Sequence, residues 1–368
     1  MSPSLSRKLL SIHRWCSVIV SVNYVFFALT GLVLIYHAEI DEALGVIPKD
    51  LADASGEMIS MDRALTMAHE ANPKLTPIFA VQPEELPGVA LLAFAAGSER
   101  FRSAKVVAVD RHGGGRILPK LDILNTVTRF IVRLHAELLL RTPGRIGLGI
   151  VGGAILTSLV TGFVVYGPTM KRFVFGLLRR DKSPRTYLAD IHKLLGVATF
   201  GWNVVIAATG VLLCFGSLLL QHYSRTEVSS FAAQYAGQPA VTDLSTIDRA
   251  IASAEATAPG RRWTRVIFPG AELSTPRHFT VFLEGGEGIE KHMFALTVVD
   301  AQDPANAKER DLPLYLKAFF VSEPLHFGDY GGLPLKLLWT AFTLLSLALS
   351  VTGVWTFFLG RFRRRARA

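Results

Sequence analysis

Two things are scarce in this chain: cysteine, and charged residues within four long apolar stretches. Cys16 and Cys214 are the only cysteines among the 368 residues. Cys16 opens the first apolar stretch and Cys214 lies late in the third. Because both stretches are expected to cross the membrane in the same direction, the two thiols should lie most of a bilayer apart. No disulfide is therefore expected, and we interpret both residues as buried thiols.

The four apolar stretches are long enough to cross a membrane. Half of all residues are hydrophobic and the mean hydropathy is +0.35. Each stretch exceeds the roughly 20 residues that are needed to span about 30 Å of hydrocarbon. Lys193 and Lys336, at their edges, are the only charged residues in them. We therefore expect four transmembrane helices, at residues 15–37, 146–167, 193–220 and 335–359. The first is too long for a signal-peptide core, so we predict that it is retained.

Basic residues cluster beside these stretches and so predict the topology. The clusters are Arg7, Lys8 and Arg14; Lys171, Arg172, Arg179, Arg180, Lys182 and Arg185; and Arg361, Arg363, Arg364, Arg365 and Arg367. By the positive-inside rule, the N-terminus (1–14), the loop at 168–192 and the tail at 360–368 are cytoplasmic, and both long loops are periplasmic. The net charge of +9 then reflects topology. We expect no nucleic-acid partner, and we interpret the Arg-rich tail as a solvated anchor.

The two long loops are similar to each other. Residues 60–73 read SMDRALTMAHEANP and residues 246–259 read TIDRAIASAEATAP. Each has apolar residues at helical spacing and ends at proline, which predicts a short amphipathic helix. Strand-like runs follow, VALLAFA and AKVVAVD in the first loop and HFTVFLE and FALTVVD in the second, with glycine turns at 113–115 and 285–286. We expect small periplasmic α+β modules at 38–120 and 221–334, and an interfacial helix at 121–145.

This organisation predicts a mainly α membrane protein built from two tandem repeats. Each repeat has the order span, long loop, span, so the two halves have the same orientation. A pseudo-twofold axis along the membrane normal would then relate them, as in transporters with parallel repeats. Such an axis brings equivalent residues of the two halves face to face.

Four of the ten histidines form two matched pairs. His13 and His192 each lie eighteen residues before the glycine of a Thr-Gly step, and His135 and His326 each lie twenty-seven residues before another. The steps are Thr30-Gly31, Thr209-Gly210, Thr161-Gly162 and Thr352-Gly353, in that order. The topology places the first pair at the cytoplasmic boundary and the second at the outer boundary. Because haem with two axial histidines needs one imidazole on each face, the pairs predict two haems whose iron they bind.

Alternatives remain at several of these positions. An imidazole at a membrane interface is often only a polar cap. The Thr-Gly steps fit close packing against another helix as well as against a flat macrocycle. Arg14 and Lys193 follow the cytoplasmic-side histidines and are candidates for contacts with haem propionates. However, adjacent positions on a helix diverge by about 100°, so we favour topology anchoring for both.

His37 has no counterpart in the second half, where Gly216 occupies the equivalent position. It lies 24 residues after His13, about 36 Å along a helix, and so at the outer face. We consider it an alternative ligand of the periplasmic-side haem, or a group that acts on substrate or protons. Tyr36 and Glu39 are further candidates for the substrate surface, and His222 is a weaker rival ligand. We interpret the remaining histidines as surface residues: His69, His112, His278 and His292.

The histidine strings and the paired modules resemble a known family. They are the H-R and H-K starts of the first and third stretches, LHAELL and PLHFGDYGGLP before the second and fourth, and the D-R-A modules. Together they resemble the PepSY-associated transmembrane family over nearly the whole chain. Four spans without a fused flavin domain are most similar to the bacterial inner-membrane ferric-siderophore reductases of the FoxB type.

The resemblance implies an enzyme of the bacterial inner membrane with two b-type haems. It implies that electrons pass from a cytoplasmic reductase or from quinol to Fe(III) in a periplasmic ferric siderophore, which releases Fe(II) for iron uptake. The sequence has no dinucleotide fingerprint and no region like a flavin reductase, so a cytoplasmic donor would be a separate protein or a quinol.

Three other functions are kept as hypotheses. One is a general membrane cytochrome b that passes electrons from quinol to another periplasmic acceptor. Another is a non-enzymatic PepSY membrane protein that binds peptides or regulates a peptidase. A transporter is less favoured, because the spans lack the intramembrane charges and broken helices typical of one.

Overall fold

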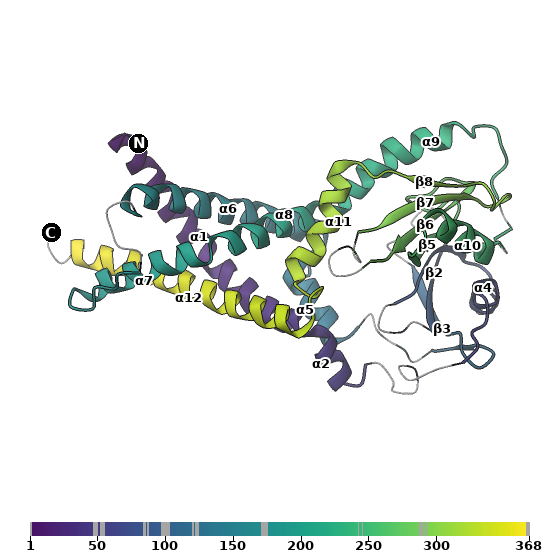
Figure 1. Cartoon of the computed structure of the whole chain (residues 1–368), viewed down its shortest axis with the longest axis horizontal. Coiled ribbons are helices and arrows are strands. Elements are labelled where there is room, and N and C mark those ends of the chain that lie inside the picture. The colour runs from purple at the N-terminus through teal and green to yellow at the C-terminus, as the bar shows by residue number, and fades with distance from the viewer. Residues whose placement is uncertain are drawn as a thin grey trace. The chain divides into compact units, whose positions relative to one another are not determined.

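The computed structural model describes residues 2–46, 51, 56–83, 86, 88–96, 104–119, 121, 125–170, 176–241, 243–244, 246–286, 290 and 293–365. The chain divides into two compact units, each described here by itself (Figure 1). The helical unit comprises residues 1–38, 127–215 and 322–368, and the sheet unit comprises residues 39–126 and 216–321.

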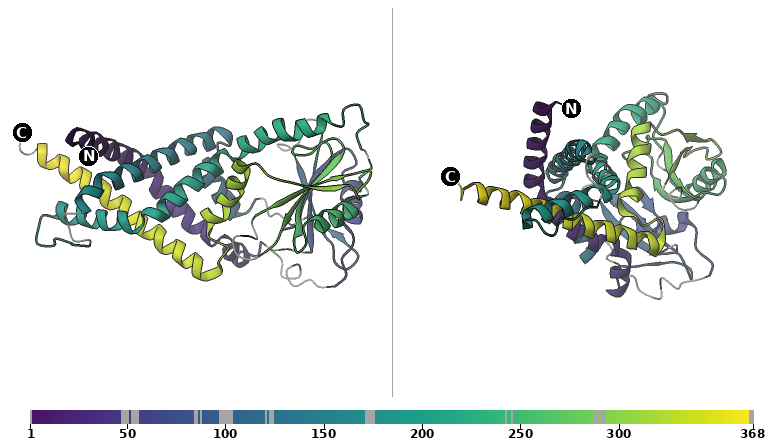
Figure 2. Two further views of the ribbon diagram at one scale, coloured as in Figure 1. Left: turned by 45° about the horizontal axis from the view of Figure 1, so that its top comes forward. Right: turned by 60° about the vertical axis from the view of Figure 1, so that its left-hand side comes forward.

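The helical unit is built from long apolar helices. They are α1 (Pro3–Ile35), α5 (Val127–Glu137), α6 (Thr142–Met170), α7 (Pro184–Ala198), most of α8 (Phe200–Tyr223), the end of α11 (Leu314–Phe327) and α12 (Gly332–Arg365). Helix α1 packs against α5, α6 and α12, and α12 packs against α7 (Figure 2). Among the described residues, four helices are long and apolar enough to cross a membrane, at 3–35, 142–167, 200–233 and 332–359. The expected four spans are thus present as helices.

Helix boundaries differ from the sequence prediction where polar residues start or extend a helix. The stretch at 168–192, expected to be a loop, contains the first part of α7. This helix begins at Pro184 because Ser183 accepts a hydrogen bond from the Thr186 N–H and proline fits the first turn. Hydropathy locates only the apolar part of a helix, so the start at Pro3 and the extension of α12 to Arg365 were also missed.

The polypeptide reverses direction sharply between α5 and α6. Helix α5 ends at Glu137, well inside the 121–145 range that was expected to be helical. Leu138, Leu139 and Arg141 then adopt positive φ angles of 49°, 60° and 58°, a conformation that side chains other than glycine rarely take. Buried Glu137 accepts a hydrogen bond from Nε of Arg145 in α6 and forms an ion pair with the same guanidinium, which connects the two ends of the turn.

Residues expected to form two separate modules form one eight-stranded antiparallel sheet. Its order is β4-β3-β2-β1-β5-β6-β7-β8. The strands are β1 (Thr76–Val81), β2 (Val89–Ala95), β3 (Lys105–Asp110), β4 (Arg116–Ile117), β5 (Arg262–Ile267), β6 (His278–Glu284), β7 (Ala295–Asp300) and β8 (Ala307–Arg310). The predicted strands β2, β3, β6 and β7 are confirmed. The pairing of β1 with β5 was not foreseen, and it merges the two halves: Phe79, Ala80 and Val81 pair with Ile267, Val266 and Arg265.

The predicted amphipathic helices, α4 (Met61–Glu70) and α10 (Ile247–Thr257), are confirmed and share one hydrophobic core with the sheet. Phe94, Phe268 and Phe279 are fully buried in that core. A second core contains residues of β1, β2, β5, β6 and β7 and includes Leu316 and Phe320 of α11. The second loop also keeps helical structure further than expected: α8 is followed by a π-helical turn (Ser224–Val228) and α9 (Ser229–Ala233).

The interpretation of His278 as a surface residue was wrong. It is 2% exposed at the start of β6, where its imidazole hydrogen-bonds Thr275 and packs against Phe231 and Tyr235. Burial lowers the pKa of His278 to about 4. His69 is exposed and His112 is partly buried. Four other residues named in the predictions lie outside the described residues: His292, Lys171, Arg172 and Arg367.

Two aspartates connect the halves of the sheet unit. The Asp248 carboxylate accepts hydrogen bonds from the N–H groups of Met61 and Asp62, at 2.9 and 2.7 Å. Asp62 in turn accepts one from the Ile247 N–H at 3.1 Å. Each carboxylate thus binds the N-terminus of the other helix, where the helix dipole favours negative charge. Burial, together with the nearby Asp248 carboxylate, raises the pKa of Asp62 to about 6.

This pair predicts a pH-dependent stability. The folded-state pKa of Asp62 lies above the ordinary value of 3.8, so its contribution is complete below pH 3.8 and is lost as the pH rises through about 6. Asp62→Asn keeps an oxygen for the Ile247 N–H and removes one charge. Over this pH range, wild type should therefore lose on the order of 1 kcal/mol more stability than the variant, a figure reduced for solvent screening. Denaturant unfolding of the full chain in detergent measures this difference, with exposed Glu70→Gln on the same helix as the control. The prediction would be contradicted if the free energy of unfolding depended on pH equally in wild type and in Asp62→Asn.

Candidate functional site

The structure brings the four paired histidines together as two facing pairs. The ring centroids of His13 on α1 and His192 on α7 are 6.3 Å apart, with their planes inclined by 56°. Those of His135 on α5 and His326 on α11 are also 6.3 Å apart, inclined by 64°. The two members of each pair come from different halves of the chain. Equal spacing in sequence has therefore become equal separation in space.

Each imidazole lies against the glycine of a Thr-Gly step. A Cβ atom placed on Gly162 would be 2.7 Å from Cε1 of His13, and one on Gly353 would be 2.8 Å from Cε1 of His192. The corresponding distances are 3.1 Å from Gly210 to His326 and 3.7 Å from Gly31 to His135. The absence of a side chain is thus what lets the first three imidazoles approach so closely. The Thr-Gly steps are contact surfaces for the histidines, an outcome that the two alternatives considered from sequence did not include.

Three of the imidazoles hydrogen-bond the helix backbone beside these glycines. In each case Nδ1–H is the donor. His13 donates to the Ser158 carbonyl at 2.8 Å, and His192 donates to the Leu349 carbonyl at 3.0 Å. His326 donates to the Ile206 carbonyl at 3.1 Å. Each carbonyl belongs to the residue four positions before the contacted glycine, so it is the oxygen that accepts that glycine's own N–H in the helix. Without a Cβ on the glycine, the imidazole can share this oxygen.

The fourth imidazole reaches a neighbouring helix through a hydroxyl. Nδ1 of His135 lies 2.7 Å from Oγ1 of Thr30, and that hydroxyl donates to the Phe26 carbonyl at 2.8 Å. In the second half, Oγ1 of Thr209 likewise lies 3.1 Å from Nδ1 of His326. A carbonyl can only accept, and the Thr30 hydroxyl proton is already used, so Nδ1 carries the proton in all four rings. The Nε2 lone pair of each ring is therefore available to a metal ion.

The contacts are reciprocal within each half of the chain. His13 on α1 lies against α6, whereas Gly31 on α1 receives His135 from α5, which leads into α6. The second half repeats this: His192 lies against α12, and Gly210 on α8 receives His326, which precedes α12. Because eighteen residues of helix span about 27 Å, the two pairs lie near opposite ends of the transmembrane helices.

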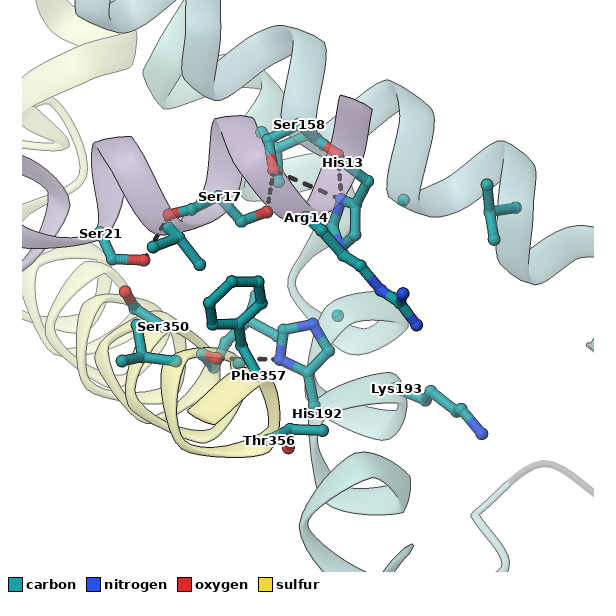
Figure 3. A pocket seen from close by; sticks show the side chains of 18 of the residues that line it. His13, Arg14, Ser17, Ser21, Ser158, His192, Lys193, Ser350, Thr356 and Phe357 are labelled. Carbon is teal, nitrogen blue, oxygen red and sulfur yellow. Dashed lines mark hydrogen bonds between the residues drawn. The ribbon is translucent and has the colours of Figure 1, made fainter. Parts of the chain in front are cut away.

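A cavity of about 720 Å³ surrounds the first pair, and we call it the His13 cavity (Figure 3). The two imidazoles point into it from α1 and α7. Arg14 and Lys193 also line it, and Lys193 lies 3.7 Å from the Asp190 carboxylate. Their role as topology anchors stays a prediction. Arg7 and Arg185 add two further cationic side chains to the lining. One part of the cavity is therefore suited to carboxylates.

Hydroxyl and amide groups line the other part of the cavity. Tyr24 donates to Oδ1 of Asn203 at 2.5 Å, and Nδ2 of Asn203 donates to the hydroxyls of Thr199 and Ser346 at 2.8 and 2.9 Å. Asn203, Thr199 and Ser346 are all at most 3% exposed. This cluster joins α1, α8 and α12, and Tyr24 lies between the helix positions of the two histidine pairs. The sequence analysis did not predict this polar cluster. An asparagine within an apolar span could have indicated it, because polar residues in a span usually face the interior of the helix bundle.

The residues at the end of α1 that were predicted to contact substrate or haem have hydrogen-bond partners within the protein. His37 opens α2 (His37–Ala43), and its Nδ1–H donates to the Leu34 carbonyl at 2.9 Å. The Tyr36 hydroxyl lies 3.0 Å from Oγ1 of Thr340, and Glu39 is in the first turn of α2. Their roles in binding or catalysis stay predictions. The ring of His222, on α8, lies 5.7 Å from that of Tyr315. Cys16 and Cys214 are free and partly buried.

The apolar helices and their facing histidines define a membrane protein with paired metal-ligand candidates. The chain belongs to the family of the PepSY-associated TM region, whose pattern matches residues 10–361 and so includes all four paired histidines. It is also similar to a protein of Pseudomonas aeruginosa that is described only as uncharacterized, with 26% identity over 240 residues. That match covers 59% of this chain and 56% of the relative, so it spans about half of the relative's length.

The contact between Gly162 and His13 predicts opposite effects for two substitutions on α6. Gly162→Ala places a methyl group 2.7 Å from His13, displaces the imidazole and breaks its bond to Ser158, which should cost about 1–3 kcal/mol. Gly153→Ala meets no atom within 4 Å and should gain about 0.5–1 kcal/mol from helix propensity. Thermal unfolding in detergent should therefore give a lower midpoint for Gly162→Ala and an equal or higher one for Gly153→Ala. Two equal midpoints would contradict the role of Gly162.

Proposed function

We propose that this protein is a dihaem b-type electron conduit that reduces ferric siderophores at the periplasmic face of the bacterial inner membrane. In this proposal the termini are cytoplasmic and the sheet unit is periplasmic. The observation that carries it is the common orientation of the four imidazoles, each held through Nδ1 so that Nε2 is left for a metal ion.

The separation within each pair fits one iron atom between two imidazoles. Metal–imidazole bonds of about 2 Å on each side would place the ring centroids roughly 6 Å apart, and both pairs measure 6.3 Å. The described residues contain no group of three or more His, Cys, Asp or Glu side chains that could hold a metal ion. Two protein ligands per site suit haem, because the macrocycle supplies the other ligands itself.

The residues around the pairs fit non-covalent haem of the b type. A c-type attachment needs a C-x-x-C-H motif, and neither cysteine of this chain stands in one. The His13 cavity offers apolar walls to the macrocycle and would hold its carboxylates through Arg14, Lys193, Arg7 and Arg185. His135 and His326 would hold the second haem.

Bound haem supplies one-electron exchange between Fe(III) and Fe(II). The chain's own residues fix the ligands for it. The carbonyls of Ser158, Leu349 and Ile206 and the hydroxyl of Thr30 hold the rings in one tautomer and one orientation, which strengthens the basicity of Nε2.

Reduction of a ferric siderophore is favoured as the activity because the chain belongs to this family and resembles its siderophore reductases. Siderophores hold Fe(III) far more firmly than Fe(II), so one-electron reduction releases the iron for uptake. Tyr36, His37 and Glu39, at the sheet-unit end of α1, are the candidates for the substrate surface, with His37 as an alternative ligand. The donor in this proposal is a cytoplasmic reductase or a quinol.

Two other functions make different demands on the site. A general cytochrome b would use the same histidines with another periplasmic acceptor. A non-enzymatic protein that binds peptides or regulates a peptidase needs no facing imidazoles, whereas these are largely withdrawn from the surface and paired across the two halves. The redox functions are therefore favoured.

Haem content tests the proposal directly. The purified protein should show a b-type reduced-minus-oxidised absorption spectrum and two haems per chain. His13→Ala or His192→Ala should remove one haem, and His135→Ala or His326→Ala the other, because each haem would lose one of the two imidazoles that hold it. Exposed His69→Ala should keep both. A preparation without b-type signal would exclude both redox functions, and full haem content in all four variants would exclude the paired ligands.

The substrate is tested with the haem-loaded protein. After reduction by dithionite under anoxia and removal of the excess, addition of a ferric siderophore should reoxidise the haems and form Fe(II), which a ferrous chelator reports. Ferrioxamine, ferric enterobactin and ferric pyochelin represent three classes of iron ligand. If the haems stay reduced with all of them, the general cytochrome is favoured instead.

A further inference from the structure

A second hollow, here called the α1/α12 groove, runs between two transmembrane helices. It has a volume of about 600 Å³ and is almost entirely apolar. Its lining includes Ser21 and Val22 from α1 and Ser350, Val351, Val354 and Trp355 from α12. Val22 is 79% and Trp355 60% exposed. On helices that cross a membrane, such side chains face the hydrocarbon, so the groove opens to lipid.

The groove adjoins the His13 cavity. Ser21, Ser350 and Val354 line both. Gly353, next to Val354, is the glycine that contacts His192. The hydroxyls of Ser21 and Ser350 point toward one another (Figure 3). A molecule in the groove would thus have its apolar part in lipid-facing surroundings and its polar end beside the cavity that holds the paired imidazoles.

The depth of the two serines limits what the polar end can be. Ser21 lies eight residues after His13 on a continuous helix, about 12 Å further into the span. A charged phospholipid headgroup is expensive at that depth. A neutral headgroup that can donate and accept hydrogen bonds is not, because Ser21, which donates its hydroxyl proton to the Ser17 carbonyl, can still accept, and the Ser350 hydroxyl can do both. These requirements describe an isoprenoid quinol, which has a long apolar tail, a flat neutral ring and two hydroxyl groups.

We propose that the α1/α12 groove binds a membrane quinol, and that this quinol is the electron donor. The proposal rests on the proposed function, since it needs haem at His13 and His192. The two O–H bonds of the quinol break and quinone is formed. Its two electrons would pass to the haems that the two histidine pairs would hold, one to each, and its two protons would leave to solvent at the cationic end of the His13 cavity. Ser21 and Ser350 orient the headgroup by hydrogen bonds, and the fully reduced protein can then reduce two ferric siderophores.

Reduction kinetics with a soluble quinol test the proposal. The haem-loaded protein in nanodiscs is mixed under anoxia with decylubiquinol or with a reduced menaquinone analogue, and the ferrous haem absorption is followed. Val351→Trp fills the groove from a position that lines the groove but does not line the His13 cavity. It should slow reduction by about tenfold or more, equivalent to at least about 1.4 kcal/mol. Haem content and reduction by dithionite should stay as in wild type. The control is Ile150→Trp on α6, a residue that is 68% exposed and outside the groove.

A binding measurement gives a second readout that needs no electron transfer. A photoreactive azidoquinone should label peptides from residues 21–25 or 351–359, and excess decylubiquinone should prevent the labelling in wild type. Val351→Trp should reduce labelling, and Ile150→Trp should not.

The outcomes separate this proposal from the proposed function. A protein that carries both haems but is reduced by neither quinol overturns the quinol site and leaves the conduit intact, with a cytoplasmic reductase as donor. Labelling that decylubiquinone does not prevent, or that Ile150→Trp reduces as strongly as Val351→Trp, also overturns it, because the groove then takes only lipid chains. A protein without haem fails the proposed function itself.

Discussion

The arrangement of the helical unit depends on one local constraint: an imidazole must reach an oxygen on the surface of another helix. Side chains normally cover that surface, so the approach is closest where the facing residue is glycine. His13 reaches the Ser158 carbonyl past Gly162, and His192 reaches the Leu349 carbonyl past Gly353. Each of these bonds fixes a rotation of one helix about its axis relative to another. The helices must then pack with both rings directed inward, so helix packing and ring orientation are set together.

The sequence predicted the parts of this architecture that depend on spacing and hydropathy. Four spans follow from apolar length, and α4 and α10 follow from helical periodicity and closing prolines. The face-to-face pairs followed from equal spacing combined with duplicated order. The reason why glycine is needed could not be predicted, because it depends on which helix lies opposite: Gly162 serves His13, whereas Gly31 on the same helix as His13 serves His135.

The other differences between prediction and structure have one physical cause. Contacts between residues far apart in the chain produce no recognisable pattern in the local sequence. Strand β5 carries Arg262, Trp263 and Arg265 and does not read as a buried strand, yet it pairs with β1 at the centre of the sheet. His278 looked like a surface residue because burial at the start of β6 is decided by Phe231 and Tyr235, more than forty residues earlier in the chain. The polar cluster at Asn203 likewise needs Tyr24 and Ser346 from two other helices.

The central pairing of β1 with β5 also matters for biosynthesis. Residues 76–81 are made long before residues 262–267, and during that interval β1 presents an open edge with unsatisfied backbone groups. The caps that Asp248 gives to the α4 helix are equally absent until then. The first half of the sheet unit therefore emerges without its central strand partner and without these caps, and gains them only when the second half is synthesised.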